Sequence, residues 1–326
     1  MTALPKPQVN QFITELRSVL TSASEKKSFR ALHKRLPFRV ALAFLFDWLL
    51  IILSVLLASQ SLLFFPVSLL LIGSRQRALS NLVHDASHGN LLSNRKMNDF
   101  LTNVFAAYAG FESVANYRRG HFKHHRFLGL KGLDPDTDSH FRYGFDDSKP
   151  RQEPPFSLYV SLLLSPSSWK DSVFGPFTQL SFAEKAQVLI WWGVILVSIT
   201  LVSGLSAMFL FLFLWIVARG TSYHAIRVFA EFLDHTGLPL GSSLSFTRNL
   251  PHRGLFSSLV HPHEDTYHLI HHLFPRIPHH QLRQAHQVLN QSSQYLRAHH
   301  CDSYFFGQHS AVACWTGRCN QGFSWA

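Results

Sequence analysis

Three short segments rich in histidine constrain this chain more than any other feature of its sequence. Each places imidazoles three or four residues apart, so in a helix the side chains of each segment would share one face. The eight histidines are His84 and His88; His121, His124 and His125; and His268, His271 and His272. Imidazole binds iron, copper, zinc and nickel well, and one first-row ion takes roughly four to six ligands. The sequence therefore predicts a site for two metal ions.

The alternative is a chance cluster of surface histidines, because histidine is common here, at 21 of 326 residues. At that frequency a His-x-x-His-His pattern is expected roughly 0.1 times per chain. Two such patterns beside a third histidine pair favour the metal site. Zinc is satisfied by four ligands and has no redox chemistry. Eight nitrogen donors suit a pair of larger, redox-active ions, of which iron is the commonest, and two irons can use O2 to break a C–H bond.

Long apolar runs separate the histidine segments and are long enough to cross a membrane. We expect four spans, at about residues 40–57, 62–83, 187–203 and 205–219. Basic residues precede the first run, while Arg75, Arg77 and Arg219 follow later runs, which places both termini and all histidine segments in the cytoplasm. The sequence predicts an all-α integral membrane protein, with four transmembrane helices in two hairpins and a cytoplasmic helical cap that carries the metals.

On this basis the chain divides into three parts. Residues 1–39 form a cytoplasmic N-terminal segment, residues 40–290 the membrane domain, and residues 291–326 a cytoplasmic tail. Asp47 is an ionisable residue inside the first span, about two turns from the basic flank, and we expect a hydrated carboxylate at the membrane interface. A membrane protein that only binds zinc or transports metal is a further alternative, but it would need more such residues inside its spans.

The net charge of +11 is consistent with nucleic acid, a membrane surface or an acidic protein as partner. The sequence has no nucleic-acid-binding motif, and its basic residues lie beside apolar runs. The prediction is therefore contact with membrane lipids and with an acidic protein, and no nucleic-acid partner.

The motifs resemble those of integral-membrane fatty acid desaturases of the bacterial type, within the histidine-box superfamily that also holds hydroxylases and carotenoid ketolases. The resemblance covers roughly residues 40–290. It is carried by His84-Asp85-x-x-His88 before Gly89-Asn90, by His121-x-x-His124-His125 before Asp134-Pro135-Asp136, and by Tyr267-His268-x-x-His271-His272-Leu273-Phe274-Pro275.

The resemblance implies that the eight box histidines bind two irons. It also implies a ninth ligand after the fourth span, for which His235 is favoured over His224. Carboxylates that follow the second box, Asp134 and Asp136, either orient ligand imidazoles or form a solvated acidic turn. Further candidates for contact with the ligands are Asp85, Asp234 and His261.

The implied activity is O2-dependent insertion of a C=C bond into a fatty acyl chain, presented as an acyl-lipid or acyl-thioester in an apolar tunnel. No haem domain is recognisable in the chain, so the resemblance implies a separate electron donor such as an acidic ferredoxin. The implied location is the bacterial inner membrane. The alternative within the superfamily is a hydroxylase or ketolase that acts on a carotenoid, an alkane or an amine.

Overall fold

The computed structural model describes residues 13–14, 16–17, 20, 23–143, 155–250 and 254–315. The predicted terminal segments, 1–39 and 291–326, therefore lie partly outside the described residues. The described chain is mostly helical, with two very short strands. Its first half contains α2 (Ala23–Ala31), α3 (Pro37–Gln60), η1 (Leu62–Phe64), α4 (Phe65–Ser87), α5 (Arg95–Thr102), η2 (Asn103–Ala107), α6 (Val114–Phe127), α7 (Pro135–Arg142), α8 (Pro155–Leu163), α9 (Pro166–Val173) and α10 (Gly175–Gln179).

The second half begins with two long apolar helices and ends in short ones. Its elements are α11 (Phe182–Ser203), α12 (Leu205–Ala218), η3 (Arg219–Tyr223), α13 (His224–His235), α14 (Ser243–Phe246), β1 (Arg248–Asn249), α15 (Gly254–Val260), α16 (His268–Leu273), η4 (His279–Gln281), α17 (Leu282–Leu289), α18 (Ser293–Leu296), β2 (His299–His300) and α19 (Ala311–Trp315).

Four helical stretches are long and apolar enough to cross a membrane, which confirms the prediction of four such helices. They are Pro37–Gln60, Leu62–Ser87, Phe182–Ser203 and Leu205–His235. Large apolar side chains such as Leu53, Leu201 and Phe209 are more than half exposed on them. Such surfaces are unfavourable in water but suit lipid, where the helix also satisfies its own backbone hydrogen bonds. By their length and composition, these four stretches indicate a membrane protein.

Local sequence sets where the long helices begin and end. Ser181 and Glu184 form a capping box at the start of α11, each side chain bonding to the other's backbone nitrogen. The same helix ends at Gly204, whose φ of 85° is a conformation that glycine adopts without strain. The chain then turns directly into α12.

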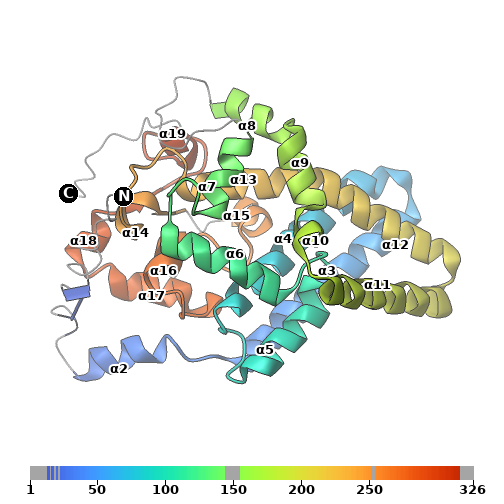
Figure 1. Cartoon of the computed structure of the whole chain (residues 1–326), viewed down its shortest axis with the longest axis horizontal. Helices are drawn as coiled ribbons and strands as arrows, with labels where there is room; N and C mark the ends of the chain where they lie inside the picture. Colours follow the sequence, from blue (N-terminus) through green and yellow to red (C-terminus); the bar gives the residue numbers. More distant parts are fainter. Residues whose placement is uncertain are drawn as a thin grey trace.

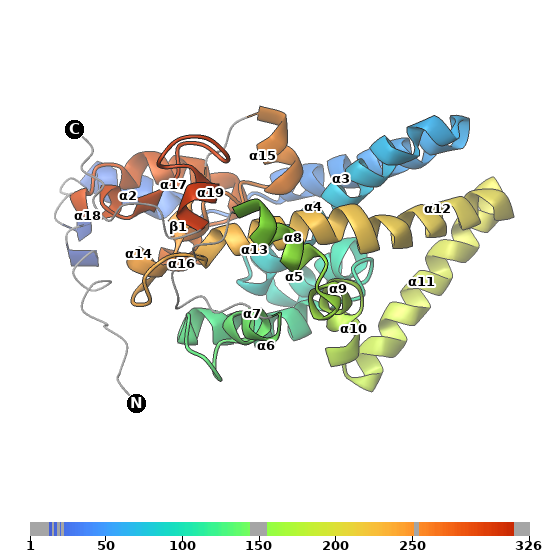
Figure 2. The same cartoon turned by 90° about the horizontal axis from the view of Figure 1, so that it is seen from above.

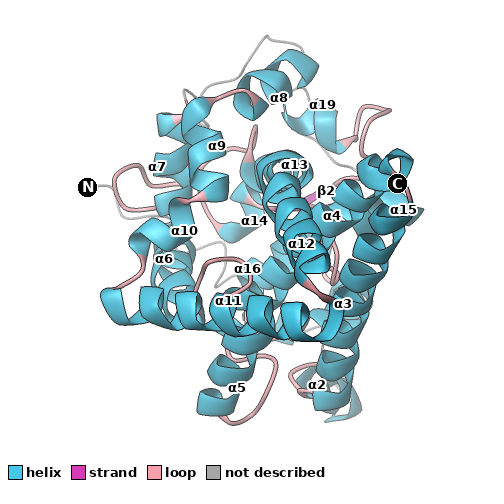
Figure 3. Ribbon diagram, turned by 90° about the vertical axis from the view of Figure 1, so that its right-hand side faces the viewer, coloured by secondary structure: helices cyan, strands magenta, loops and turns pink. Residues whose placement is uncertain are grey.

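The four apolar stretches pack together at one end of the molecule. α3 packs along α4, α11 against α12, and α12 also contacts both α3 and α4. Figures 1 and 2 show both turns, between α3 and α4 and between α11 and α12, at the right-hand end of the molecule. Figure 3, viewed from that end, shows α11 crossing α12 at a steep angle. Trp215 of α12 links the two pairs of helices. Its ring stacks on Trp48 of α3 and meets Trp192 of α11 edge-on, each at 5.9 Å between ring centroids.

The expectation for Asp47 is wrong. Its side chain is fully buried rather than hydrated, and its two carboxylate oxygens bond to groups from distant parts of the chain. Arg75 Nη1 lies 2.9 Å from Oδ1, and His263 Nε2 lies 2.8 Å from Oδ2. An ion pair satisfied on both sides can be buried where a lone carboxylate could not. Local spacing cannot pair Asp47 with His263, because the two residues lie 216 positions apart in the sequence.

The short helices form a cap around the far end of α4. In Figure 2 α6, α7, α13, α14, α16 and α17 lie at the end opposite to the two turns. The parallel pair β1 and β2, with Arg248 opposite His299, ties the residues after α18 to this cap. The cap is therefore built from segments of both halves of the chain.

Two segments of π-helix interrupt the regular helices. η2 follows α5, and η3 joins α12 to α13 so that Leu205–His235 is one continuous helical stretch. Gly73 of α4 packs so closely on η3 that an added Cβ would lie 2.5 Å from the backbone nitrogen of Tyr223. π-Helical turns often occur at functional sites, and these two prove to line the same cavity.

Candidate metal centre

The three histidine segments and the end of α13 converge inside the cap. His84 lies in the last turn of α4 and His88 is its C-terminal cap. The second box lies on α6, a helix that begins where the Ser113 hydroxyl accepts a hydrogen bond from the backbone nitrogen of Asn116. The third box forms α16, and His235 is the last residue of α13.

The structure brings nine histidines into two adjacent groups, each with its ligand nitrogens within 4.8 Å of one another. The first group has five members, His84, His88, His121, His125 and His271. The second has four members, His124, His235, His268 and His272. Neighbouring residues of one box, such as His124 and His125 or His271 and His272, enter different groups. Each of these boxes therefore contributes to both groups.

The spacing of the ring nitrogens matches that of ligands around an ion. In the first group His125 Nε2 lies 2.9 Å from both His121 Nε2 and His271 Nε2. In the second, His268 Nε2 lies 2.9 Å from His235 Nε2 and 3.0 Å from His272 Nε2. Two nitrogens held about 2.1 Å from one ion are separated by about 3.0 Å at a right angle and about 3.4 Å at a tetrahedral angle. The groups thus have the dimensions of two coordination shells.

Hydrogen bonds from the outer nitrogens fix two imidazoles of the second group. His235 Nδ1 lies 2.7 Å from the carbonyl oxygen of Phe246, which can only accept, so Nδ1 carries the proton. His124 Nδ1 lies 3.0 Å from Asp134 Oδ1. In its neutral form each ring therefore directs an unprotonated Nε2 towards the other members of the group. Lone pairs converging in this way repel one another unless a cation lies between them, so these residues fit a metal ion.

The electrostatics keep most of these imidazoles neutral, which metal binding requires. Burial lowers the pKa of His88 to about 3. Burial and the neighbouring histidines also lower the pKa values of His121 and His271 well below the usual range. His124 differs, because burial lowers its pKa but the carboxylates of Asp136 and Asp134 outweigh that effect and raise it.

Asp134 is the carboxylate that organises the second box from outside. Besides His124, it accepts hydrogen bonds from the backbone nitrogens of Gly129 and Asp136 and from the Thr137 hydroxyl. These bonds and the charge of His124 outweigh burial and lower its pKa to about 2. Asp136 Oδ2 also lies near His124, 3.3 Å from Nδ1. The acidic turn was expected either to orient ligand imidazoles or to be solvated, and the distances to His124 agree with the first interpretation.

The other residues predicted to contact the ligands, Asp85, Asp234 and His261, have different partners. Asp234 Oδ2 lies 3.8 Å from His268 Nδ1, next to the second group. Asp85 instead accepts hydrogen bonds from the ring and backbone nitrogens of His279, a residue that the sequence analysis left out of the site. His261 lies against Tyr304, with Nδ1 3.1 Å from the hydroxyl.

His224, the alternative ninth ligand, uses both ring nitrogens elsewhere. Nε2 donates to the carbonyl oxygen of Leu163 at 3.0 Å, so Nδ1 is the acceptor for the Ser172 hydroxyl at 2.6 Å. It belongs to neither group, whereas His235 belongs to the second.

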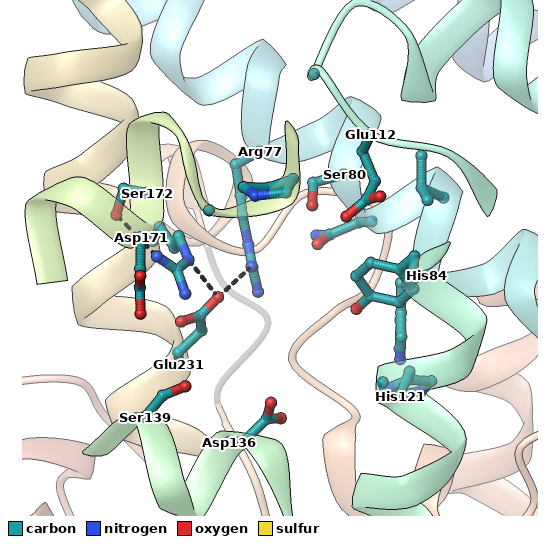
Figure 4. A pocket seen from close by; sticks show the side chains of 18 of the residues that line it. Arg77, Ser80, His84, Glu112, His121, Asp136, Ser139, Asp171, Ser172 and Glu231 are labelled. Carbon is teal, nitrogen blue, oxygen red and sulfur yellow. Dashed lines mark hydrogen bonds and ion pairs between the residues drawn. The ribbon is translucent and has the colours of Figure 1, made fainter. Parts of the chain in front are cut away.

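A cavity of about 280 Å³ reaches both histidine groups from the side of α6, α12 and α13. Figure 4 shows His84 and His121 on one wall, with Glu231 and Asp171 across from them. The lining contains four arginines and six carboxylates, listed here together: Arg77, Arg142, Arg219, Arg227, Glu112, Asp136, Asp171, Glu231, Asp234 and Asp265. The sequence analysis missed most of these residues. The run of ionisable side chains at the end of the fourth apolar stretch could have indicated this polar cavity.

Comparison with known proteins points to one family. The family model for fatty acid desaturases matches residues 59–304, which include every histidine of both groups. The dihydrorhizobitoxine desaturase of Bradyrhizobium elkanii is 28% identical over 247 residues, which cover 72% of this chain and 70% of that relative.

Proposed function

The chain belongs to the fatty acid desaturase family, and we propose that it is a membrane-bound di-iron desaturase that uses O2 and an external electron donor. The observation that carries the proposal is the pair of adjacent histidine groups. Five nitrogen donors exceed the tetrahedral shell of structural zinc and suit a redox-active ion such as iron.

The proposed reaction removes one hydrogen from each of two neighbouring carbons and leaves a C=C bond. It balances with O2, two electrons and two protons consumed and two water molecules released. Two bound irons would supply the oxidising power for it. The nine histidines would hold them, five around one and four around the other, and the buried site would keep bulk water away from the reacting carbons.

The protein's own contribution is to fix ligand orientation and substrate position. Asp134 and the carbonyl oxygen of Phe246 hold the His124 and His235 rings with Nε2 facing inwards. The cavity beside the two groups would place the reacting carbons within reach of both.

The membrane arrangement is part of the same proposal. The four apolar stretches would form two hairpins, with the cap and the histidine groups in the cytoplasm and the protein in a bacterial inner membrane. Residues 1–39, 40–290 and 291–326 would be the N-terminal segment, the membrane domain and the tail. A protein of net charge +11 suits an acidic ferredoxin-like donor at its cytoplasmic face.

The family name implies a lipid or acyl substrate, and an acyl-lipid or acyl-thioester is the class that it predicts. The Bradyrhizobium elkanii relative is named for the desaturation of dihydrorhizobitoxine. We therefore propose desaturation as the reaction of this chain without assigning the acyl carrier.

Two measurements test the proposal, the metal content of the protein and the mass of the product. Protein purified after iron-replete growth should contain about two irons per chain. With reductant and O2, the product of a substrate found by metabolite profiling should be lighter by two hydrogens. A product heavier by one oxygen would assign a hydroxylase or ketolase instead, and zinc alone without O2 uptake would contradict both.

A further inference from the structure

The cavity beside the histidine groups has a lining that an alkyl chain does not need. Ten of its lining residues are arginine, aspartate or glutamate. A hydrocarbon that displaced water from this lining would desolvate charged groups and leave any polar atom that lacks a protein partner without a hydrogen bond, which is costly. The cavity volume of about 280 Å³ also lies just below the range of typical small-molecule sites, roughly 300–1,000 Å³. Both properties favour a compact, polar substrate.

Most of these charges neutralise one another within the wall. Three arginines pair with carboxylates, with nitrogen–oxygen distances of 2.8, 2.8 and 2.9 Å. The pairs are Arg77 with Asp265, Arg227 with Glu231, and Arg142 with Asp171. Figure 4 shows Glu231 bonded to Arg77 on the wall that faces His84. These paired residues shape the cavity but leave no charge to bind a ligand.

Arg219 is the exception among the cavity arginines. It is only 2% exposed, and no carboxylate of the described residues lies within 4.0 Å of it. Its Nε donates to the carbonyl oxygen of Val173, and its guanidinium lies over the rings of Phe111 and Tyr223 at 5.5 and 4.9 Å. These contacts hold the guanidinium in place without neutralising it. A buried cation of this kind is stabilised by an anion, and guanidinium binds carboxylate with two parallel hydrogen bonds.

Glu112 lies near Arg219 and also has binding capacity left. Its Oε1 accepts both of its hydrogen bonds, from the backbone nitrogen of Ser113 and from Asn116 Nδ2, each at 2.8 Å. Oε2 accepts none from the residues that the structure describes. Figure 4 shows the Glu112 carboxylate pointing into the cavity beside Ser80. Burial raises the pKa of Glu112 to about 7, although its hydrogen bonds and the charge of Arg219 lower it.

The two side chains are close enough to influence each other electrostatically but do not form an ion pair. The gap has a positive group on one side and a carboxylate on the other. An α-amino acid carries an ammonium and a carboxylate on a single carbon, so its two charges are complementary to those of Glu112 and Arg219. Both π-helical segments border this part of the cavity, η2 through Ala106 and Ala107 and η3 through Arg219 and Tyr223.

We propose that the substrate is a small α-amino acid, with its carboxylate bound by Arg219, its ammonium bound by Glu112, and its side chain extending to the histidine groups. The inference rests on the proposed desaturase function, because it names the molecule whose carbons that site would oxidise. It differs from an acyl-lipid or acyl-thioester in both size and charge.

Binding measurements with a matched series of six-carbon probes test the proposal. The probes are L-norleucine, which carries both charges, hexanoate, which lacks the ammonium, and hexylamine, which lacks the carboxylate. Binding to the metal-loaded full chain in detergent is followed by equilibrium dialysis. L-Norleucine should bind at least about tenfold more tightly than either partial probe, a difference of about 1.4 kcal/mol.

Two variants assign the contacts through ratios measured within each protein, so a general loss of folding does not imitate the result. Glu112→Gln should abolish the preference for L-norleucine over hexanoate and keep the preference over hexylamine. Arg219→Gln should do the reverse. The surface variant Arg283→Gln, whose side chain is 56% exposed, is the matched control and should keep both preferences.

Equal binding of the three probes, no saturable binding of L-norleucine up to about 10 mM, or competition by palmitoyl thioester alone would overturn the inference. None of these results bears on whether the enzyme desaturates. Conversely, tight amino acid binding with a product heavier by one oxygen would keep this inference and reject the proposed desaturation.

Discussion

Asp47 and Arg75 form an ion pair enclosed between α3 and α4, with Oδ1 2.9 Å from Nη1 and neither side chain more than 6% exposed. Replacing Asp47 with Asn would leave the guanidinium buried without its countercharge. Loss of one partner of a buried pair costs about 3–5 kcal/mol, and we expect Asp47→Asn to lower the unfolding free energy in detergent by that amount. Arg283→Gln breaks a surface pair and should cost less than about 1 kcal/mol. Equal losses in the two variants would show that the pair inside the bundle has no special weight.

The first histidine group should lose its metal when one central ligand is removed. His271 Nε2 lies 2.9 Å from His125 Nε2 and 3.3 Å from His121 Nε2, so His271→Ala removes a nitrogen that is central to the group. We expect iron content to fall from about two to about one per chain, and activity to be abolished. His280→Ala is the control, because His280 belongs to neither group. Full metal content in His271→Ala would refute the assignment of the first group.

Asp134→Asn separates the charge of this residue from its role at the start of α7. Asparagine can still accept the hydrogen bond from the backbone nitrogen of Asp136, so the helix should remain capped. The carboxylate that orients His124 is lost, and we expect metal affinity to fall by about 10- to 100-fold in a chelator competition assay. Asp138→Asn, which changes an acceptor for the backbone of Gly132, should leave affinity unchanged.

Glu112 predicts a pH dependence of stability in the absence of substrate. Burial raises its pKa from an ordinary value of 4.5 to about 7. Between these values the folded protein holds more protons than the unfolded chain, so this residue's contribution to stability is lost as pH rises through about 7. Glu112→Gln cannot titrate, and its stability relative to wild type should increase from pH 5 to pH 8 by at most about 3 kcal/mol. A relative stability that is flat across this range would contradict the burial of the carboxyl group.

Gly73→Ala tests the close packing of α4 on η3. The new Cβ would clash with the Ser222 hydroxyl and lie 2.5 Å from the backbone nitrogen of Tyr223. Forcing an atom into such a contact costs about 1–3 kcal/mol, and the displaced η3 should also weaken substrate binding. Gly193→Ala is the matched control, since nothing lies within 4 Å of its added Cβ. The thermal unfolding midpoints of the two variants test this prediction, and equal midpoints would contradict the close packing of α4 on η3.

Sequence reasoning found the features that depend on local order. Helical spacing places His268 and His272 on one face, and apolar run length defines the four membrane-length helices. The preference for His235 over His224 came from the resemblance alone, and only His235 joins a group.

Features that depend on distant partners were not accessible in this way. Asp47 was misjudged because its state is set by Arg75 and His263, which lie on other segments. Arg219 was interpreted only as a marker of membrane orientation. Its separation from the carboxylates of the described segments is a property of the packed cavity, which no local sequence pattern encodes.

The π-helical turn at η3 sets the rotational phase of the long helical stretch that contains it. Each residue of an α-helix advances the side-chain direction by about 100°, so one inserted residue turns everything beyond it. Past η3, Arg227, Glu231 and His235 recur every four residues, and all three line the cavity. Before it, Phe209, Phe213 and Ile216 point outwards and are exposed. A single wide turn thus lets one helical stretch meet two environments. Its first part presents apolar side chains suited to lipid, and its second part presents charged side chains to the cavity.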